Sequence, residues 1–460
     1  MNRKESAVDP ASLGCAGYQQ FRSRRHWMAQ SASAFSLASS GAWSPLVQRL
    51  AAESPHPNRS APATNIILLW MQGGPSQMET FDPHPEGDGG EQVGTIETEI
   101  PDIAISSWLP ESARQLGLGT LIRSMVSKEG DHERATYNMR TGWRPDPTVV
   151  HPSIGSLVCH LLGSSTTIPA HVSILPGEWP SRGGALGAAL DAFQIGDPRN
   201  PLPNLRAPTG EARQQRRLAA LSDLLEPQFE KGRLADLDRM RTQHRSSMER
   251  AQEMMQSDQL AAFELAKEPA EIVAQFGDHA FGRGCLAAVR LVEAGVRCVE
   301  VELSGWDSHI NNMELQKGQC QILDRALAAT LQELVRRGLL EHTLLVCSGE
   351  FGRTPNLNPA GGRDHWPVGF SSFVAGAGIA ARHAIGATSA KPRMEPERRL
   401  ENVDRPVTVE DLHATLLTCF GIDAKEEWKT PVGRPLAWSQ GRVVESMLDR
   451  SRFRNGTWKF

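Results

Sequence analysis

The sequence predicts an α/β fold in which a sheet of buried strands is sandwiched by helices and carries a helical insertion. Short runs of apolar residues, closed by glycine, proline or polar residues, indicate strands that are covered on both faces. Leucines at helical spacing lie between two of these runs, as a strand–helix–strand unit requires. A long stretch rich in Ala, Leu, Glu, Gln and Arg indicates the insertion.

The predicted elements follow in a simple order along the chain. Strands are expected at 64–71, 296–303, 343–347 and 370–375. The helix expected at 313–337 carries Leu315, Ile322, Leu323, Leu327, Leu331 and Leu334 on one face. Several helices are expected within 210–291, and Pro- and Arg-rich loops at 178–210 and 384–405. One sheet domain with an insertion therefore describes the chain better than a row of separate domains.

Three regions are expected from these patterns. They are a leader and linker at 1–63, the α/β domain at 64–425 with its insertion at about 210–291, and a C-terminal tail at 426–460. Arg24 and Arg25 precede an uncharged stretch rich in Ala, Ser and Leu, which is the order of a twin-arginine export signal. We therefore expect an exported protein of the periplasm or cell envelope. The alternative is a cytoplasmic enzyme in which the two arginines are incidental.

Charge and composition exclude several classes of function. The chain has 49 Lys and Arg against 53 Asp and Glu, a net charge of −4, so no broad basic field for nucleic acid is expected. No run of 18 apolar residues occurs, which argues against a transmembrane helix. The seven cysteines include no C-x-x-C pair, which argues against a zinc ribbon and a disulfide framework.

Candidate metal ligands follow the predicted strands, where ligands bind in open α/β sheets. Asp307 and His309 follow the second strand, and His365 precedes the fourth. These three side chains match the ligands of zinc and leave a coordination position open, as in catalytic sites. Glu350 and Asp364 are expected to hold a second cation or to orient the imidazoles. Zinc is the expected ion, with manganese, magnesium and calcium as alternatives.

Four further residues are candidates for catalysis. Ser76 follows Gly-Gly-Pro at a strand end, where it attacks or binds an anion, or only caps a tight turn. His132 lies in a polar segment as a ligand, a base, a phosphate partner or a helix-entry residue. Arg353 and Arg363 are candidate binders of an oxyanion, since guanidinium matches the geometry of phosphate and sulfate.

Several long motifs together resemble a known family. They are IILLWMQGGPSQMETFDP at 66–83, GDHERATYNMRTG at 130–142, RLVEAGVRCVEVELSGWDSH at 290–309, GEFGRTPN at 349–356 and GRDHWP at 362–367. With the arginine leader they resemble the bacterial domain-of-unknown-function family 1501. That family is similar to the alkaline phosphatase/sulfatase superfamily, which hydrolyses phosphate or sulfate esters with one or two divalent metals.

The resemblance implies an alkaline-phosphatase-like sheet, and it implies a metal site at Asp307, His309 and His365. Glu350 stands where the superfamily has an Asp-His pair, and Gln72 stands where the superfamily usually has an Asp ligand. The C-x-P-S-R nucleophile motif of sulfatases is missing. We therefore expect an exported, metal-dependent hydrolase of phosphate or sulfate esters, either small molecules or polysaccharides. The alternative is an exported binding protein that keeps the sheet without the chemistry.

Overall fold

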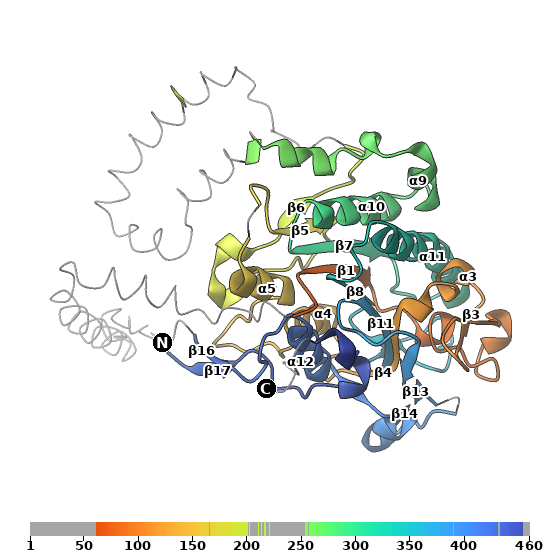
Figure 1. Cartoon of the computed structure of the whole chain (residues 1–460). Helices are drawn as coiled ribbons and strands as arrows, with labels where there is room; N and C mark the ends of the chain where they lie inside the picture. The colour runs from red at the N-terminus through yellow and green to blue at the C-terminus, as the bar shows by residue number, and fades with distance from the viewer. Residues whose placement is uncertain are drawn as a thin grey trace, which may run out of the picture. The chain divides into compact units, whose positions relative to one another are not determined.

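The chain divides into two units, Met1–His56 and Pro57–Phe460. The computed structural model describes residues 61–453, except position 165, most of 201–256, and positions 390, 431 and 432. The predicted leader and most of the linker therefore lie outside the described residues, as does most of the predicted insertion between 210 and 256. Figure 1 shows the helices and strands of the described part of the second unit.

A mixed sheet forms the centre of the described residues, where it has nine strands in the order β12-β4-β11-β8-β1-β7-β5-β6, with β15 paired to β4. The strands are β1 Asn65–Gln72, β4 Gly119–Val126, β5 His171–Ile174, β6 Phe193–Ile195, β7 Cys298–Ser304, β8 Thr343–Ser348, β11 Val368–Gly376, β12 His383–Ile385 and β15 Val407–Thr408. All pairs are parallel except those of β11, which runs antiparallel to β4 and β8. The ends of β1, β4, β7 and β8 therefore meet the start of β11 at one edge.

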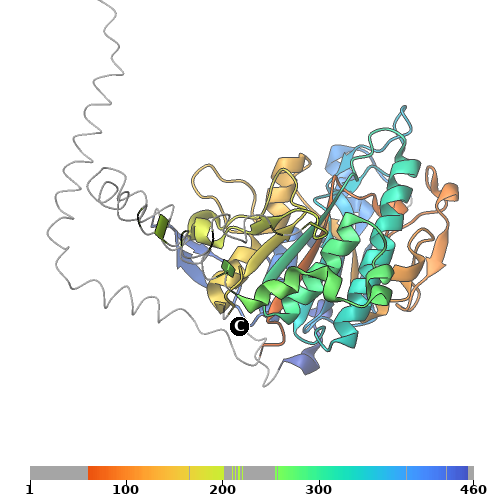
Figure 2. The same cartoon turned by 90° about the horizontal axis from the view of Figure 1, so that it is seen from above.

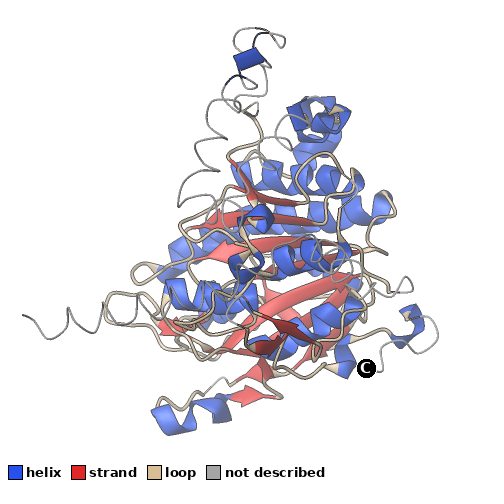
Figure 3. Cartoon of the chain, turned by 90° about the vertical axis from the view of Figure 1, so that its left-hand side faces the viewer, coloured by secondary structure: helices blue, strands red, loops and turns tan. Residues whose placement is uncertain are grey.

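Helices cover both faces of this sheet (Figure 3). The α-helices are α3 Pro110–Ala113, α4 His132–Thr141, α5 Ile154–Leu162, α9 Ala270–Gln275, α10 Ala280–Glu293, α11 Asn312–Arg336 and α12 Val409–Cys419. Along β1, Ile67, Leu69 and Met71 pack into one core with α10 and α11, which Figure 2 shows lying over the sheet. Ile66 and Trp70 face the other core with α5 and α12. Successive side chains of the strand alternate between the two cores. Because both cores are apolar, the whole strand is a continuous apolar run.

Shorter elements complete the fold. The two-stranded pairs are β2 Thr95–Glu97 with β3 Ala104–Ser106, β9 Gly352–Arg353 with β10 His365–Trp366, β13 Ala387–Thr388 with β14 Val403–Asp404, and β16 Glu427–Lys429 with β17 Pro435–Ala437. The 3₁₀ helices are Gln77–Glu79, Gly90–Gln92, Leu116–Leu118, Gly184–Leu186, Ala188–Leu190, Asp258–Phe263, Leu265–Lys267, Pro396–Asn402, Glu445–Met447 and Arg450–Arg452.

The four predicted strands correspond to β1, β7, β8 and β11, and the predicted helix at 313–337 corresponds to α11. The described part of the predicted insertion contains α9 and α10, and α10 packs directly on the sheet. The predicted loops at 178–210 and 384–405 contain the short strands β6, β12, β13 and β14.

The stretch predicted as a C-terminal tail packs against the domain as far as it is described. Trp438, Met447, Leu448 and Phe453 are buried in the same core as α12. None of the described helices is long and apolar enough to cross a membrane. The cysteines at 159, 285, 298, 320, 347 and 419 are buried free thiols.

Candidate metal centre

Three imidazoles meet at the edge where β4, β7 and β8 end. His132 is the first residue of α4, His309 follows β7, and His365 lies in β10 just before β11. The ring centroids of His132 and His365 are 4.4 Å apart, and those of His309 and His365 are 4.8 Å apart. Asp131 fixes the start of α4, because its side chain accepts a hydrogen bond from the backbone N–H of Arg134.

The Nδ1 atom of each ring lies at hydrogen-bond distance from an acceptor oxygen. His132 Nδ1 lies 2.8 Å from Glu350 Oε1, and His309 Nδ1 lies 2.8 Å from Asp364 Oδ1. His365 Nδ1 lies 2.7 Å from the carbonyl oxygen of Gly130. A carbonyl or an ionised carboxylate can only accept, so each neutral ring carries its proton on Nδ1 and has a free lone pair on Nε2. This is the arrangement of histidines that ligate metals.

The three Nε2 atoms converge on one carboxylate. Asp307 lies with its oxygens 3.5 Å from Nε2 of His132, 3.2 Å from Nε2 of His309 and 3.6 Å from Nε2 of His365. The Nε2 atoms of His309 and His365 are 3.0 Å apart. One ligand atom each of His132, Asp307 and His365 lies within 4.8 Å of the other two.

The separations among His132, Asp307 and His365 fit a single divalent cation, and His309 lies close to two of these side chains, Asp307 and His365. Bonds of about 2.0–2.1 Å place two ligand atoms of a tetrahedral zinc ion roughly 3.3 Å apart. The two facing lone pairs of His309 and His365 repel one another without a cation between them. The donor set of imidazole nitrogens and one carboxylate suits zinc better than magnesium or calcium, which prefer oxygen ligands.

A buried arginine holds Asp307 in place. Arg353 is fully buried, and its Nη2 donates to Asp307 Oδ1 at 2.5 Å. The same guanidinium donates to the carbonyl oxygens of Gly73 and Gly74. A side chain at Gly73, whose φ is +114°, would lie 2.5 Å from the backbone nitrogen of Asp307, so this approach requires glycine. Burial raises the pKa of Asp307, but the hydrogen bond and charge of Arg353 outweigh it and lower the pKa, so Asp307 is ionised.

Glu350 is a fully buried carboxylate directly behind His132. Its Oε1 accepts from the backbone N–H of Gly73 at 2.8 Å and from Gln72 Nε2 at 3.2 Å, as well as from His132. Its Oε2 has no hydrogen-bond partner among the described residues. Burial lowers the pKa of His132, but the hydrogen bond and charge of Glu350 outweigh it and raise the pKa. Glu350 therefore orients His132.

Asp364 orients His309 in the same way, on the solvent-exposed side of the cluster. Its Oδ1 also accepts from Asn358 Nδ2 at 3.2 Å, and its pKa is lowered chiefly by the hydrogen bond from His309. Phe351 forms the wall behind the rings, with centroids 5.0 Å from His132 and 4.4 Å from His365. Sequence reasoning missed Phe351, although its place between Glu350 and Arg353 in the GEFGRT motif pointed to it.

Two of the predicted catalytic residues are held elsewhere. Arg363 is fully buried, and its guanidinium donates to Glu79 Oε1 at 2.8 and 3.1 Å and to the carbonyl oxygens of Thr354, Pro355 and Asp88. Ser76 is also fully buried, and its hydroxyl has no partner among the described residues. Within the described part of the chain, neither side chain bonds to the cluster, so neither is placed to bind a leaving oxyanion or to attack an ester.

Comparison with known proteins adds a family and several distant structures. The sequence model of the family DUF1501, described as a protein of unknown function, matches residues 63–448. No curated protein matches the sequence. A protein in the alkaline phosphatase superfamily from Vibrio parahaemolyticus is 13% identical, with a TM-score of 0.40 over 85% of this chain and 74% of that one.

Two further structures are similar at the same distance. The PsFucS1 sulfatase from Pseudoalteromonas sp. is 13% identical, with a TM-score of 0.38 over 82% of this chain and 70% of that one. A phosphonate monoester hydrolase from Silicibacter pomeroyi is 10% identical, with a TM-score of 0.34 over 84% and 76%. At this distance the case for a function depends on the side chains of the cluster.

Proposed function

The chain belongs to the DUF1501 family, and from the cluster that its residues build we propose that it is a metal-dependent hydrolase of phosphate or sulfate esters. One observation carries the proposal. Three imidazoles have their Nδ1 atoms anchored to Glu350, Asp364 and the Gly130 carbonyl, and their Nε2 atoms converge on Asp307. Such oriented ligands at the edge of an α/β sheet are what a catalytic metal requires.

Each residue of the centre has a separate task. Asp307 and Nε2 of His132, His309 and His365 would hold the ion. The chemistry that a bound divalent cation supplies is polarisation of an ester oxygen and acidification of a water molecule. Arg353 keeps Asp307 ionised and fixed, and Glu350, Asp364 and Gly130 keep the ring protons on Nδ1. Phe351 shields the inner side of the rings from water.

The second candidate function is a metal-binding protein that binds anionic esters without cleaving them. The burial of Ser76 favours it, because the one predicted nucleophile has no access to a substrate. In the hydrolase, water attacks the ester directly and no nucleophilic side chain is needed. The two candidate functions therefore differ in whether the bound ester is converted to product.

The test combines metal analysis with turnover. Purified protein is loaded in turn with zinc, manganese, magnesium and calcium, and its metal content and hydrolysis of 4-nitrophenyl phosphate and sulfate are measured. We expect one tightly bound ion and hydrolysis of one ester, both lost in Asp307→Ala and His365→Ala. The control His160→Ala removes an exposed imidazole of α5 and keeps both properties. If no ion binds stoichiometrically, the proposal fails. If an ion binds but neither ester is hydrolysed, only the second candidate function, a metal-binding protein, remains.

We also propose export through the segment around Arg24 and Arg25. Replacing both with lysine removes the paired guanidinium groups but keeps the charge, so the wild-type chain is expected in the periplasmic fraction and the variant in the cytoplasm. Arg3→Lys is the control, because it changes an arginine outside the pair. An unprocessed wild-type chain in the cytosol would favour the cytoplasmic alternative.

A further inference from the structure

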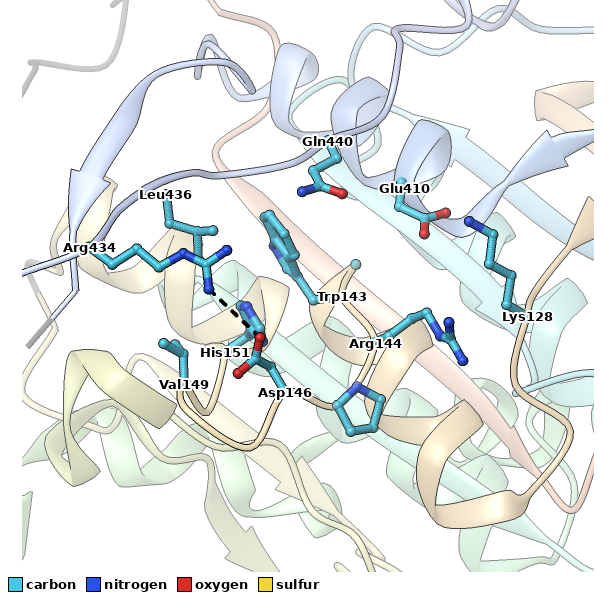
Figure 4. A pocket seen from close by; sticks show the side chains of 12 residues that line it. Lys128, Trp143, Arg144, Asp146, Val149, His151, Glu410, Arg434, Leu436 and Gln440 are labelled. Atoms are coloured by element: carbon cyan, nitrogen blue, oxygen red, sulfur yellow. Dashed lines mark ion pairs between the residues drawn. The ribbon is translucent and has the colours of Figure 1, made fainter. Parts of the chain in front are cut away.

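A polar pocket lies beside the end of α4 and the start of α12 (Figure 4). Its volume is about 250 Å³, and its walls come from four segments that are far apart in the sequence. They are the loop before α4 at Lys128, the stretch after α4 at 142–151, the start of α12 at Glu410, and the stretch around β17 at 434–440. None of these side chains takes part in the cluster described above.

The pocket and the metal centre share the loop before α4. Lys128 is two residues before Gly130, whose carbonyl accepts the proton of His365, so their Cα atoms are at most about 7.6 Å apart. Lys128 follows β4 and Glu410 follows β15, and these two strands are parallel and paired. Lys128 and Glu410 therefore lie at the edge of the sheet that carries the imidazoles.

The same loop is tied to the far wall of the pocket. Glu129 Oε1 accepts from Arg144 Nε at 2.6 Å, and Glu129 Oε2 accepts from Arg134 Nε at 2.7 Å. Arg144 lines the pocket and Arg134 belongs to the first turn of α4. Glu129 thus connects the wall of the pocket with the first turn of α4.

A rigid aromatic face stands inside the pocket. Figure 4 shows Trp143 among the polar lining groups, with His151 beside it. The two rings are stacked, with centroids 4.7 Å apart and planes 3° apart. Tyr137 bonds to His151, and the indole N–H of Trp143 donates to the carbonyl of Trp438 at 3.3 Å, so the orientation of Trp143 is fixed. Burial lowers the pKa of His151 to about 4, so the stacked pair is uncharged at neutral pH.

The groups around this face are suited to hydroxyls and to an anion. Lys128 is exposed, and its ammonium has no ion pair or hydrogen bond among the described residues. Arg434 is only loosely paired with Asp146, at 3.9 Å. Glu410 and Gln440 add a carboxylate and an amide to the lining. Cations, acceptors and one apolar ring face are what a sugar ring with hydroxyls and an anionic substituent requires.

We propose that this pocket is a subsite for one ring of an anionic saccharide whose ester group lies at the metal centre. The inference rests on the proposed function and names its substrate class. The volume suits a single ring, since it lies just below the range of about 300–1,000 Å³ for pockets that hold larger ligands. Because the ten residues of α4 span about 15 Å between His132 and the end of the helix next to Trp143, further rings of the saccharide would extend past Lys128 toward the imidazoles.

The test is calorimetric binding of defined saccharides to the full protein at physiological salt. The probes are sulfated tetrasaccharides from chondroitin, heparin and carrageenan, the desulfated counterpart of each, and inorganic sulfate. We expect at least one sulfated probe to bind more tightly than its desulfated counterpart and than sulfate. Trp143→Ala and Lys128→Gln should each weaken that binding about tenfold, and Lys391→Gln, which removes an exposed charge elsewhere, should leave it unchanged.

Three results would overturn the proposal. They are no binding of any sulfated probe to the wild-type protein, binding that Trp143→Ala leaves intact, and inorganic sulfate binding as tightly as the saccharides. The binding assay requires no turnover, so it is separable from the hydrolase assay. A chain that cleaves no ester but binds a sulfated saccharide through Trp143 would refute the hydrolase and keep the saccharide pocket.

Discussion

Arg353 shows how much of the centre depends on a single buried side chain. Its guanidinium bridges Asp307 and the carbonyls of Gly73 and Gly74, and so connects the loops that follow β1 and β7. Lysine keeps the charge but lacks the planar fork that makes these bonds together. The position is therefore one where a charge-conserving substitution is not conservative.

We predict that Arg353→Lys lowers the affinity for the metal by about 10–100-fold, the range typical of residues that orient a ligand. The dissociation constant is measured by competition with a chelator, and circular dichroism checks the fold. Arg325→Lys, which alters an exposed arginine bonded to the Ala274 carbonyl, should bind metal as the wild type does. Equal affinities for the two variants would show that the bridge is dispensable.

The sequence predicted part of this centre because strand ends converge. Asp307, His309 and His365 were predicted together, and the structure brings them together. Arg353 and Arg363 were indistinguishable in sequence, since their roles depend on partners such as Glu79, 284 residues away from Arg363. The role of His132 stayed open for the same reason, because Glu350, which fixes its Nδ1, is 218 residues away.

At the scale of elements, α4 connects the metal centre to the sheet. It ends at Gly142, which has φ of +74° and donates its N–H to the Asn138 carbonyl, as left-handed C-caps do. A Cβ there would also lie 2.7 Å from the ring of His413 on α12. The end of the helix is thus fixed both by backbone conformation and by close packing.

Gly142→Ala is predicted to lower the free energy of unfolding by about 2 kcal/mol or more, from backbone strain plus the clash. Gly338→Ala is the matched control, because Gly338 also follows a helix with positive φ in a left-handed cap, but a Cβ added there would meet no described atom within 4 Å. It should cost only about 1 kcal/mol. The free energy of unfolding of both variants is measured by urea denaturation. Equal losses would mean that the ring of His413 moves aside at no cost in stability.

The other anchor of α4 is an arginine between two carboxylates of β7. Arg140 Nη1 donates to Glu300 at 3.1 Å, and Arg140 Nη2 donates to Glu302 at 3.0 Å, with all three side chains buried. His171 also lies 3.1 Å from Glu300. Burial raises the pKa of Glu300, but the charges of Arg140 and His171 outweigh it and lower the pKa to about 2.

Removing this arginine should leave two buried carboxylates without the cation that bridges them. We predict that Arg140→Met destabilises the protein by about 3–5 kcal/mol, and that adding Glu300→Gln and Glu302→Gln restores part of the loss. The free energy of unfolding of the single and the triple variant in urea provides the comparison. A stable single variant would contradict the assigned role of the network.

The strands that could be predicted from the sequence are those with continuous apolar runs. β1, β7, β8 and β11 have such runs, whereas β4 is interrupted by Arg123 and Ser124, and β5 has only four residues. Arg123 is tolerated in a central strand because its guanidinium reaches Asp82 at 3.0 Å and the Gly386 carbonyl at 3.1 Å. These partners are distant in the sequence, so no local pattern reveals them.

At the scale of the whole molecule, stability is linked to pH through buried histidines. His413 is fully buried, its Nε2 lies 2.8 Å from the Met139 carbonyl, and burial lowers its pKa to about 4. In the unfolded chain its pKa is about 6.5. Between these values the unfolded state binds more protons, so stability is complete above pH 6.5 and falls as the pH decreases toward 4.

This single group should account for a loss of about 3 kcal/mol between pH 6.5 and 4. Urea midpoints measured across that window should fall steeply for the wild type and less steeply for His413→Gln. Parallel pH profiles for the two proteins would show that His413 does not couple folding to protons.

The sandwich of sheet and helices was predicted for the whole molecule, but the full strand order was not. Strand order depends on which distant segments pair, as in the β12–β4 and β15–β4 contacts, and local sequence patterns carry little information on that. The two cores on opposite faces are built from alternate residues of the same strands, so a single apolar run contributes to both.

The reversed direction of β11 determines how the residues of the metal centre are distributed along the sequence. Because β11 runs against β8, residues 349–367 leave the sheet and return to it at one edge. This one continuous segment supplies Glu350, Arg353, Asp364 and His365, while the neighbouring strands stay in register. Exchanging this one segment would replace all four side chains together, but Arg353 and Glu350 would keep their roles only if Gly73, His132 and Asp307 stayed in place.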